Sequence, residues 1–335
     1  MYIDYFGLKD FPFRITPDTD YLYMSPAHSR AKAYMEYAIF NREGFVVITG
    51  EIGAGKTTLI KKILTELDED VLVAKIFQTQ LDEVELLQAI LVEFGLNPFS
   101  AKKVELLNML NQFLVNSYLD GKRILLIIDD AQNLSKRVLE EITMLSSVET
   151  QKEKILHVIL VGQPELNHIL ESPDMEQLLQ RVSLRYHVRA LTDIEMGEYI
   201  AHRIKVAGID DEIILKSTFK KIYEYTGGIP RLINTLCDTA LTCAYADNIK
   251  HVNETILDNA TNELQWKKYS EIQDDHEVKK QVMFDLESLS GLSSDSEHNT
   301  NEFMQHVYSP IASRALVEIS RQLKRIADHL DKDNA

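Results

Sequence analysis

The amino-acid sequence predicts an α/β protein: a doubly wound parallel sheet, then a small all-helical domain, then a disordered C-terminal tail. Five short apolar runs between residues 45 and 188 alternate with helical patterns, and no strand-like run follows residue 190. Continuous apolar runs are typical of parallel strands that helices cover on both faces. Regular periodicity is lost after residue 266, where a polar, serine-rich stretch predicts disorder.

Composition restricts the classes of protein that fit. The chain has 335 residues, 45% of them hydrophobic, and a formal net charge of −16. This charge disfavours nucleic-acid binding, because lysine and arginine contacts to phosphate provide most of that affinity. No apolar run reaches the roughly 20 residues that span a bilayer, and the N-terminus lacks the pattern of a signal peptide. We expect a cytoplasmic protein that reaches the inner membrane only through a partner, with Cys237 and Cys243 as buried thiols.

Residues 1–43 form a lead-in segment that is rich in aromatic side chains. Its middle carries proline and aspartate, which favour turns, and the stretch from Pro26 to Phe40 has a helical pattern. We expect this lead-in segment to precede an α/β domain over residues 44–190.

A glycine-rich turn follows the first strand-like run, within GFVVITGEIGAGKTTLIKKIL at residues 44–64. The turn fits the pattern G-x-x-x-x-G-K-[ST], with a strand before it and a helix after it, as phosphate binding requires. In such a loop, backbone N–H groups and the positive end of the helix face the phosphate oxygens. We expect this phosphate loop to bind ATP through Gly50, Glu51, Ile52, Gly53, Ala54, Gly55, Lys56, Thr57 and Thr58.

Two carboxylates complete the metal side of the predicted site. Lys56 is expected to reach the β- and γ-phosphates, and the Thr57 hydroxyl is expected to ligate Mg²⁺. The strand-like stretch RILLIIDDAQNL, residues 123–134, ends its apolar run in Asp129 and Asp130. We expect Asp129 to hold the metal through water and Asp130 to orient or deprotonate the attacking water.

Four further side chains are predicted to contact the nucleotide phosphates, within the subunit or from a neighbouring one. Gln163 ends the buried run HVILVG, and ligands of doubly wound sheets lie at such strand ends. Arg231 follows a Gly-Gly-x-Pro break in the helical domain and is expected to reach the nucleotide across a cleft. Arg181 and Arg185 are interpreted as preceding the last strand and facing a neighbouring subunit. Arginine suits these roles because its charge is permanent and its fork matches phosphate oxygens.

The helical domain is expected over residues 191–266. Thr192 and Glu195 have capping-box spacing, and the first helix is expected to stop at Gly208. Further helical patterns cover 212–225, 230–246 and 253–265. A flexible linker over 267–308 and an amphipathic helix over 309–335 follow, with the heptad-like series Leu316, Ile319, Leu323, Ile326 and Leu330. This last helix either docks on the chain's own core or binds a partner; both interpretations stay open.

The order of these parts resembles an AAA+ ATPase, and more specifically the ExeA-type secretion ATPases of the general secretion pathway protein A family. Among them it resembles the stand-alone versions from exosortase/PEP-CTERM, exopolysaccharide and pilus-biogenesis loci. The similarity covers residues 1–266 and is carried by YFGLKDFPFRITPDTDYLYMS, GFVVITGEIGAGKTTL, IDDAQNL, GQPEL, QRVSLRYHV and TGGIPRLIN.

The resemblance implies Walker A and B motifs, a first sensor at Gln163, an arginine finger at Arg181 or Arg185, and a lid with a second sensor at Arg231. It also implies ATP and Mg²⁺ as ligands, a homo-oligomer, and a role in assembling a cell-envelope secretion, exopolysaccharide or pilus apparatus. It raises a second interpretation for Tyr21 and Tyr23, namely packing on adenine; we favour packing on the core.

The chain departs from the family pattern in two respects. Full-length members continue into a transmembrane helix and a periplasmic peptidoglycan-binding domain, which this chain does not show, so we expect no direct role in wall remodelling. The family usually has Asp-Glu where this chain has Asp129-Asp130. Asp130 is one methylene shorter, and a misplacement of about 1 Å can cost about 100-fold in rate. We therefore predict slow hydrolysis, suited to a switch.

Two other functions stay open on the sequence. A DNA-associated ATPase of the transposition type shares this core, but it would need a basic surface or a DNA-binding appendage. A nucleotide-dependent scaffold with little hydrolysis would also fit the substitution at Asp130.

Overall fold

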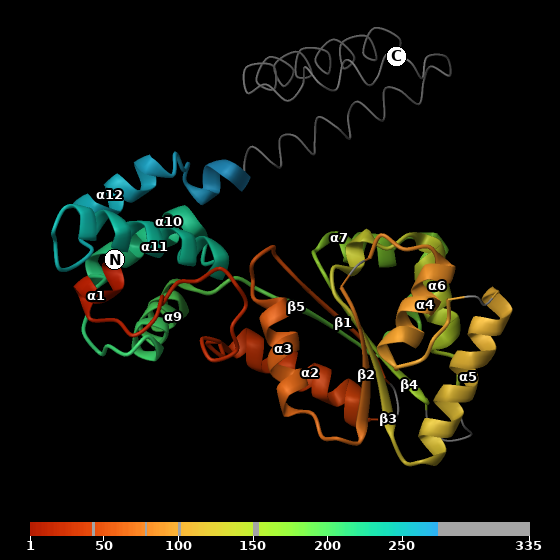
Figure 1. The fold of residues 1–335 in the computed structure, drawn as a ribbon. Coiled ribbons are helices and arrows are strands. Elements are labelled where there is room, and N and C mark those ends of the chain that lie inside the picture. Colours follow the sequence, from red (N-terminus) through yellow and green to blue (C-terminus); the bar gives the residue numbers. More distant parts are fainter. Residues whose placement is uncertain (42–43, 78, 100–101, 150–153, 274–335) are drawn as a thin grey trace, which may run out of the picture. The chain divides into compact units, whose positions relative to one another are not determined.

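The computed structural model describes residues 1–41, 44–77, 79–99, 102–149 and 154–273 (Figure 1). Met1–Gln265 form one compact unit, and a second unit begins at Trp266. The predicted helix over 309–335 and the linker from residue 274 onward lie outside the described residues. None of the helices that the structure describes combines the length and apolarity that a membrane crossing requires.

The first unit contains a five-stranded sheet in which the paired strands are all parallel. Its strands are β1 (Phe45–Gly50), β2 (Val71–Ile76), β3 (Arg123–Ile128), β4 (Leu156–Gly162) and β5 (Leu184–Val188). Their order is β2-β3-β4-β1-β5, so β4 lies between the strand before the phosphate loop and the strand before Asp129. The predicted α/β class and the five predicted strands are confirmed.

Both faces of the sheet are buried at its three central strands, β3, β4 and β1, which explains why these strands are apolar without alternation. Successive side chains of a strand point to opposite faces. Phe45 and Val47 pack in one core, and Val46 and Ile48 pack in the other. In Figure 1 the second face carries α2 (Pro26–Phe40) and α3 (Lys56–Glu66). The first face carries α4 (Glu83–Glu93), α5 (Lys103–Leu119), α6 (Lys136–Leu145), α7 (Glu165–Leu170) and α8 (Glu176–Leu179).

Helix α2 has the predicted bounds, and local chemistry explains where it begins. Ser25 is its N-cap and accepts a hydrogen bond from the backbone N–H of His28 at 3.3 Å, and Pro26 occupies the first turn. Proline is favoured there because its missing N–H would have no partner within the helix. The buried face of α2, which includes Ala31 and Met35, packs on the sheet.

The helical lid consists of α9 (Asp193–Val206), α10 (Phe219–Thr226), α11 (Pro230–Ala246) and α12 (Glu254–Glu263). The predicted capping box of Thr192 and Glu195 opens α9. The helix predicted from residue 212 is wrong in its first part. Ile214 forms an isolated parallel bridge with Val252, and a short 3₁₀ turn leads into α10. Hydrogen bonds to this distant segment hold the backbone extended where the local pattern favoured a helix.

A bidentate ion pair fixes the passage from β5 into the lid. The two terminal nitrogens of Arg189 donate to the two carboxylate oxygens of Glu195 at 2.7 and 2.8 Å. The backbone N–H of Leu191 donates to the carbonyl of Gly228 at 3.0 Å. The chain between β5 and α9 is therefore held both to the first turn of α9 and to the loop before α11.

The lead-in segment packs on the lid. Its short helix α1 (Tyr2–Phe6) contacts α11, and the hydroxyl of Tyr2 donates to Asp238 of that helix. Farther along, the buried guanidinium of Arg203 in α9 donates to the backbone carbonyls of Pro12 and Arg14. The lead-in segment, which includes α2, thus contacts both the lid and the sheet.

Candidate nucleotide-binding site

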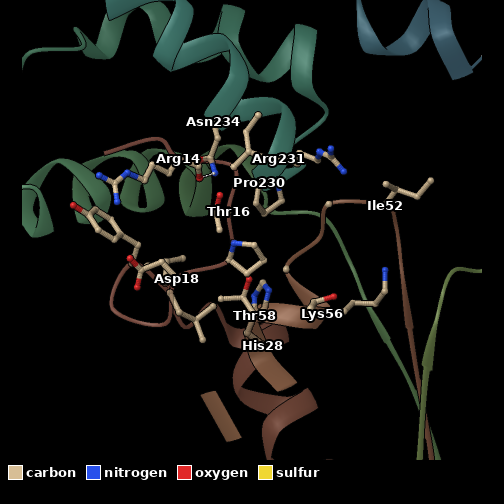
Figure 2. Close-up of a pocket in the computed structure, with 18 of the residues that line it drawn as sticks. Arg14, Thr16, Asp18, His28, Ile52, Lys56, Thr58, Pro230, Arg231 and Asn234 are labelled. Atoms are coloured by element: carbon tan, nitrogen blue, oxygen red, sulfur yellow. Dashed lines mark hydrogen bonds between the residues drawn. The ribbon is translucent and has the colours of Figure 1, made fainter. Parts of the chain in front are cut away.

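A cavity of ≈ 500 Å³ lies between the lead-in segment, the phosphate loop and the lid. Figure 2 shows Arg14 and Asp18 at one end, Ile52 and Lys56 at the other, and His28 between them. The cavity is lined by Arg14, Ile15, Thr16, Pro17, Asp18, Tyr21, Leu22, Tyr23, His28, Ile52, Gly53, Gly55, Lys56, Thr57, Thr58, Asp129, Asp130, Gln163, Leu191, Tyr199, Arg203, Pro230, Arg231 and Asn234. Residues from the lead-in segment, the phosphate loop, the ends of β3 and β4 and the lid thus share one cavity.

The phosphate loop turns back on itself at two glycines with positive φ, 81° at Gly53 and 94° at Gly55. The ammonium group of Lys56 donates to the carbonyls of Gly50 and Glu51, at 2.7 and 3.0 Å. Burial lowers the pKa of Lys56, and the nearby carboxylates of Asp129 and Asp130 act in the opposite direction. Both of these partners are neutral carbonyl groups. Lys56 takes part in none of the ion pairs found among the described residues.

The two predicted metal-side residues touch each other. The hydroxyl of Thr57 donates to the Asp129 carboxylate at 2.6 Å. Asp129 is buried, and this burial raises its pKa, while hydrogen bonds from Thr57 and from the backbone N–H of Asp130 lower it. The described residues contain no group of three or more His, Cys, Asp or Glu side chains arranged for a metal. A hydroxyl and one carboxylate nevertheless fit Mg²⁺, which takes few protein ligands and binds through phosphates and water.

Asp130 adopts a left-handed backbone conformation with φ 52°. Aspartate is among the few residues besides glycine that are enriched there, and such outliers cluster at functional sites. Its carboxylate is exposed and accepts a hydrogen bond from the Gln132 side chain at 3.1 Å.

Gln132 contacts two of the predicted site residues, Asp130 and Gln163, and the sequence did not indicate this. Its side-chain oxygen accepts the backbone N–H of Gln163 at 2.9 Å, and since an N–H can only donate, this contact fixes which end of the amide faces Asp130. Gly162 leaves room for the contact, because a Cβ there would lie 2.9 Å from the Gln132 oxygen. Gln132 therefore joins the ends of β3 and β4. The only sequence signal for Gln132 is its position two residues after Asp130, and this spacing does not indicate which residues its side chain contacts.

Arg231 lies in the cavity wall on the first turn of α11 (Figure 2). Its backbone N–H donates to the carbonyl of Gly53 at 3.2 Å. The absence of a side chain at Gly53 permits this approach, since a Cβ there would overlap the Arg231 side chain. The lid and the phosphate loop are thus in direct contact, and the role of Arg231 toward the nucleotide stays a prediction.

Arg181 and Arg185 do not line the cavity. The interpretation that both precede the last strand is wrong for Arg185, which is the second residue of β5, because that strand already begins at Leu184. The exposed guanidinium of Arg185 pairs with Glu171 at 3.2 Å. Arg181 is exposed in the turn between α8 and β5. Their action on a neighbour's site stays a prediction.

The end of the cavity away from the phosphate loop is aromatic. Tyr21 is buried under the guanidinium of Arg203, 5.0 Å from its ring centre, and Tyr23 meets Tyr199 edge-on. Both Tyr21 and Tyr23 also line the cavity, so packing within the unit and contact with a ligand are compatible.

Asn234 stands at the same end and was not anticipated from the sequence. It accepts from the Tyr199 hydroxyl at 2.6 Å and donates to the Arg14 carbonyl at 3.2 Å. This asparagine thus ties the lead-in segment to two lid helices at the cavity wall.

Comparisons with known proteins agree with this geometry. The family model described as AAA domain matches residues 40–170. General secretion pathway protein A of Aeromonas hydrophila is 39% identical over 247 residues, which make up 73% of this chain and 45% of that protein. The chain therefore spans less than half the length of this relative.

Solved structures share the fold. The ORC2 protein of Aeropyrum pernix, in its ADPNP-ADP complexes, has a TM-score of 0.57 and 16% identity and covers 94% of this chain and 99% of its own. Cdc6p of Pyrobaculum aerophilum has the same TM-score and identity, covering 78% of this chain and 70% of its own. Drosophila ORC bound to DNA has a TM-score of 0.55 at 14% identity, covering 96% and 84%. At these identities the likeness concerns the fold alone.

Proposed function

This chain belongs to the AAA+ proteins of the ExeA type, and from that premise we propose that it binds ATP with Mg²⁺ in the cavity and hydrolyses it to ADP and phosphate. The observation that carries the proposal is the 2.6 Å contact between Thr57 of the phosphate loop and Asp129 at the end of β3. It brings the phosphate-binding and metal-side residues together in one cavity.

The phosphates lie at the phosphate-loop end. Backbone N–H groups of that loop and the ammonium group of Lys56 bind the β- and γ-phosphate oxygens. Thr57 and Asp129 would hold Mg²⁺, Thr57 through its hydroxyl and Asp129 through water. The metal would supply positive charge that offsets the charge of the phosphates.

Asp130 acts on the attacking water. Its exposed carboxylate takes a proton from this water as the water oxygen bonds to the γ-phosphorus and the bond to the ADP oxygen breaks. Gln132 holds one carboxylate oxygen and leaves the other for the water. Because the same Gln132 binds the N–H of Gln163, the position of Asp130 depends on the end of β4. Gln163 faces the γ-phosphate as the first sensor.

A second copy of the chain completes the site. Arg181 or Arg185 of one subunit stabilises the transferring phosphate in the next, as arginine fingers do when supplied in trans. Within one subunit, Arg231 links nucleotide to lid through its contact with Gly53, so the nucleotide state sets the lid position and the subunit interfaces. The protein is therefore a homo-oligomer.

The biological role that we propose is assistance in assembling a secretion, exopolysaccharide or pilus apparatus of the cell envelope. The support is the 39% identity to general secretion pathway protein A, whose name places it in secretion. The protein acts in the cytoplasm, at the inner membrane through a partner protein. A DNA-associated role has no support besides the shared fold of the ORC structures, and the net charge of −16 opposes it.

Titration calorimetry with Mg·ATP and phosphate-release kinetics test the proposal on wild type, Lys56→Ala and Asp130→Asn. Lys61→Ala is the matched control, because Lys61 is an exposed lysine of the same helix. We expect Lys56→Ala to lose ATP binding, Asp130→Asn to bind ATP without hydrolysing it, and Lys61→Ala to match wild type. A wild type that binds no ATP, or a Lys56→Ala variant as active as wild type, contradicts the proposal.

A further inference from the structure

A buried histidine joins the lead-in segment to the phosphate loop. His28, in the first turn of α2, lines the cavity, and only 3% of it is exposed. One ring nitrogen, Nε2, lies 2.8 Å from the carbonyl oxygen of Ala54, and the other, Nδ1, lies 2.7 Å from the hydroxyl oxygen of Ser25. The contact with Ala54 spans 26 residues of sequence.

The partners of His28 determine its protonation pattern. A carbonyl oxygen only accepts, so Nε2 carries a hydrogen and donates to Ala54. Burial lowers the pKa of His28 and favours the neutral ring. In the neutral ring Nδ1 accepts, and the Ser25 hydroxyl donates to it. The ring is therefore a donor of fixed direction, aimed at the phosphate-loop backbone.

The hydrogen bond from His28 restrains a peptide unit that could otherwise flip easily. The Ala54–Gly55 peptide is trans, so its carbonyl and the N–H of Gly55 point in opposite directions. Glycine accepts either sign of φ, and a flipped peptide at Gly55 would present a carbonyl oxygen where phosphate oxygens bind. Gly55 also permits the close approach of the ring, because a Cβ there would lie 2.9 Å from Nε2.

We propose that His28 is a positioning residue for phosphate: by holding the Ala54 carbonyl, it directs the Gly55 N–H to the nucleotide phosphates. The inference rests on the proposed ATP site and assigns its preorganisation to a residue outside the phosphate-loop motif. It also gives the lead-in segment a second role. Tyr21 and Tyr23 line the aromatic end of the cavity, and His28 carries the same segment to the phosphate end.

The test measures Mg·ATP affinity by calorimetry for full-length His28→Gln, His28→Met and His28→Asn. Glutamine places an amide nitrogen at about the reach of Nε2 and keeps the donor. Methionine has similar length without a donor, and asparagine has a donor that reaches only as far as Nδ1. We expect His28→Met and His28→Asn to bind ATP about tenfold more weakly than wild type, and His28→Gln to stay within about threefold. Melting temperatures without nucleotide report on folding.

Equal ATP affinity in all four proteins would overturn the inference and leave the proposed function standing. Equal loss in His28→Gln, His28→Met and His28→Asn would also overturn it, because the ring would then act by packing and not as a donor. A wild type that binds no ATP would overturn the proposed function and this inference together.

Discussion

The backbone N–H of Arg231 donates a hydrogen bond to the carbonyl of Gly53, with a nitrogen–oxygen distance of 3.2 Å. This bond joins the first turn of a lid helix to the middle of the phosphate loop. The bond exists because Gly53 has no side chain to keep α11 away.

Gly53→Ala is therefore expected to weaken ATP binding by at least about tenfold. Two effects act together: φ is 81° at this residue, where a Cβ costs about 1–2 kcal/mol, and the new methyl overlaps the Arg231 side chain. Gly95→Ala is the control, since Gly95 also has a φ of 81° but a Cβ there would meet no atom within 4 Å. Calorimetry with Mg·ATP separates the two variants. Equal affinities would show that the contact with α11 does not matter.

Gln132→Ala is expected to slow ATP hydrolysis by about tenfold or more while ATP affinity stays within about threefold, because Asp130 and the N–H of Gln163 both lose their partner. Asn133→Ala, the exposed neighbour on the same 3₁₀ turn, serves as the control. Single-turnover phosphate release measures the chemical step. A Gln132→Ala rate equal to wild type would remove Gln132 from the site.

Asp130→Glu is expected to hydrolyse ATP faster than wild type, because the longer side chain brings the carboxylate closer to the attacking water, and a shift near 1 Å can change the rate about 100-fold. Glutamate is less favoured than aspartate at φ 52°, so the same variant should melt at a lower temperature. Steady-state turnover and thermal melting check both effects. Turnover no faster than wild type would contradict the hypothesis that the short side chain limits the rate.

The Arg189–Glu195 pair should make the stability of the lid depend on pH. The Arg189 guanidinium lowers the pKa of Glu195 from 4.5 to about 2, against the effect of burial. A depressed carboxylate pKa gives stability that is complete above pH 4.5 and is lost as pH falls toward 2. Glu195→Gln should thus lower the free energy of unfolding at pH 7, by about 1–3 kcal/mol, and the difference from wild type should shrink below pH 4.5. Urea unfolding at pH 7 and pH 3.5 measures the free energy of unfolding of both proteins. If the difference between wild type and Glu195→Gln were the same at both pH values, the pairing would be contradicted.

Local patterns in the sequence predict most of the fold. The apolar runs of the central strands β1, β3 and β4 are strands because a sheet buried on both faces needs no polar alternation, and Ser25–Pro26 marks the start of α2 through capping chemistry alone. The segment before α10 was assigned wrongly, because Ile214 pairs with Val252 and only tertiary contacts reveal this.

In the candidate site, too, some residues could be predicted from local sequence and others could not. The phosphate loop and the Asp129-Asp130 pair follow from contiguous motifs. Gln132 and His28 act through partners 31 and 26 residues away, and no local spacing connects them. Arg185 shows the limit for boundaries, since β5 would have to begin two residues later, at Tyr186, for Arg185 to precede the strand.

Hydrolysis by oligomers co-expressed from Lys56→Ala and Arg181→Ala chains tests most directly whether two copies share one ATP site. Each variant alone should be inactive, because one lacks the phosphate-binding lysine and the other lacks the arginine that it offers to its neighbour. Mixed oligomers should regain about a quarter of wild-type turnover, since an Arg181→Ala site is then completed by the arginine of a Lys56→Ala chain. If neither Arg181→Ala nor a parallel Arg185→Ala chain loses activity alone, or if the mixtures stay at background, the site is not shared between subunits.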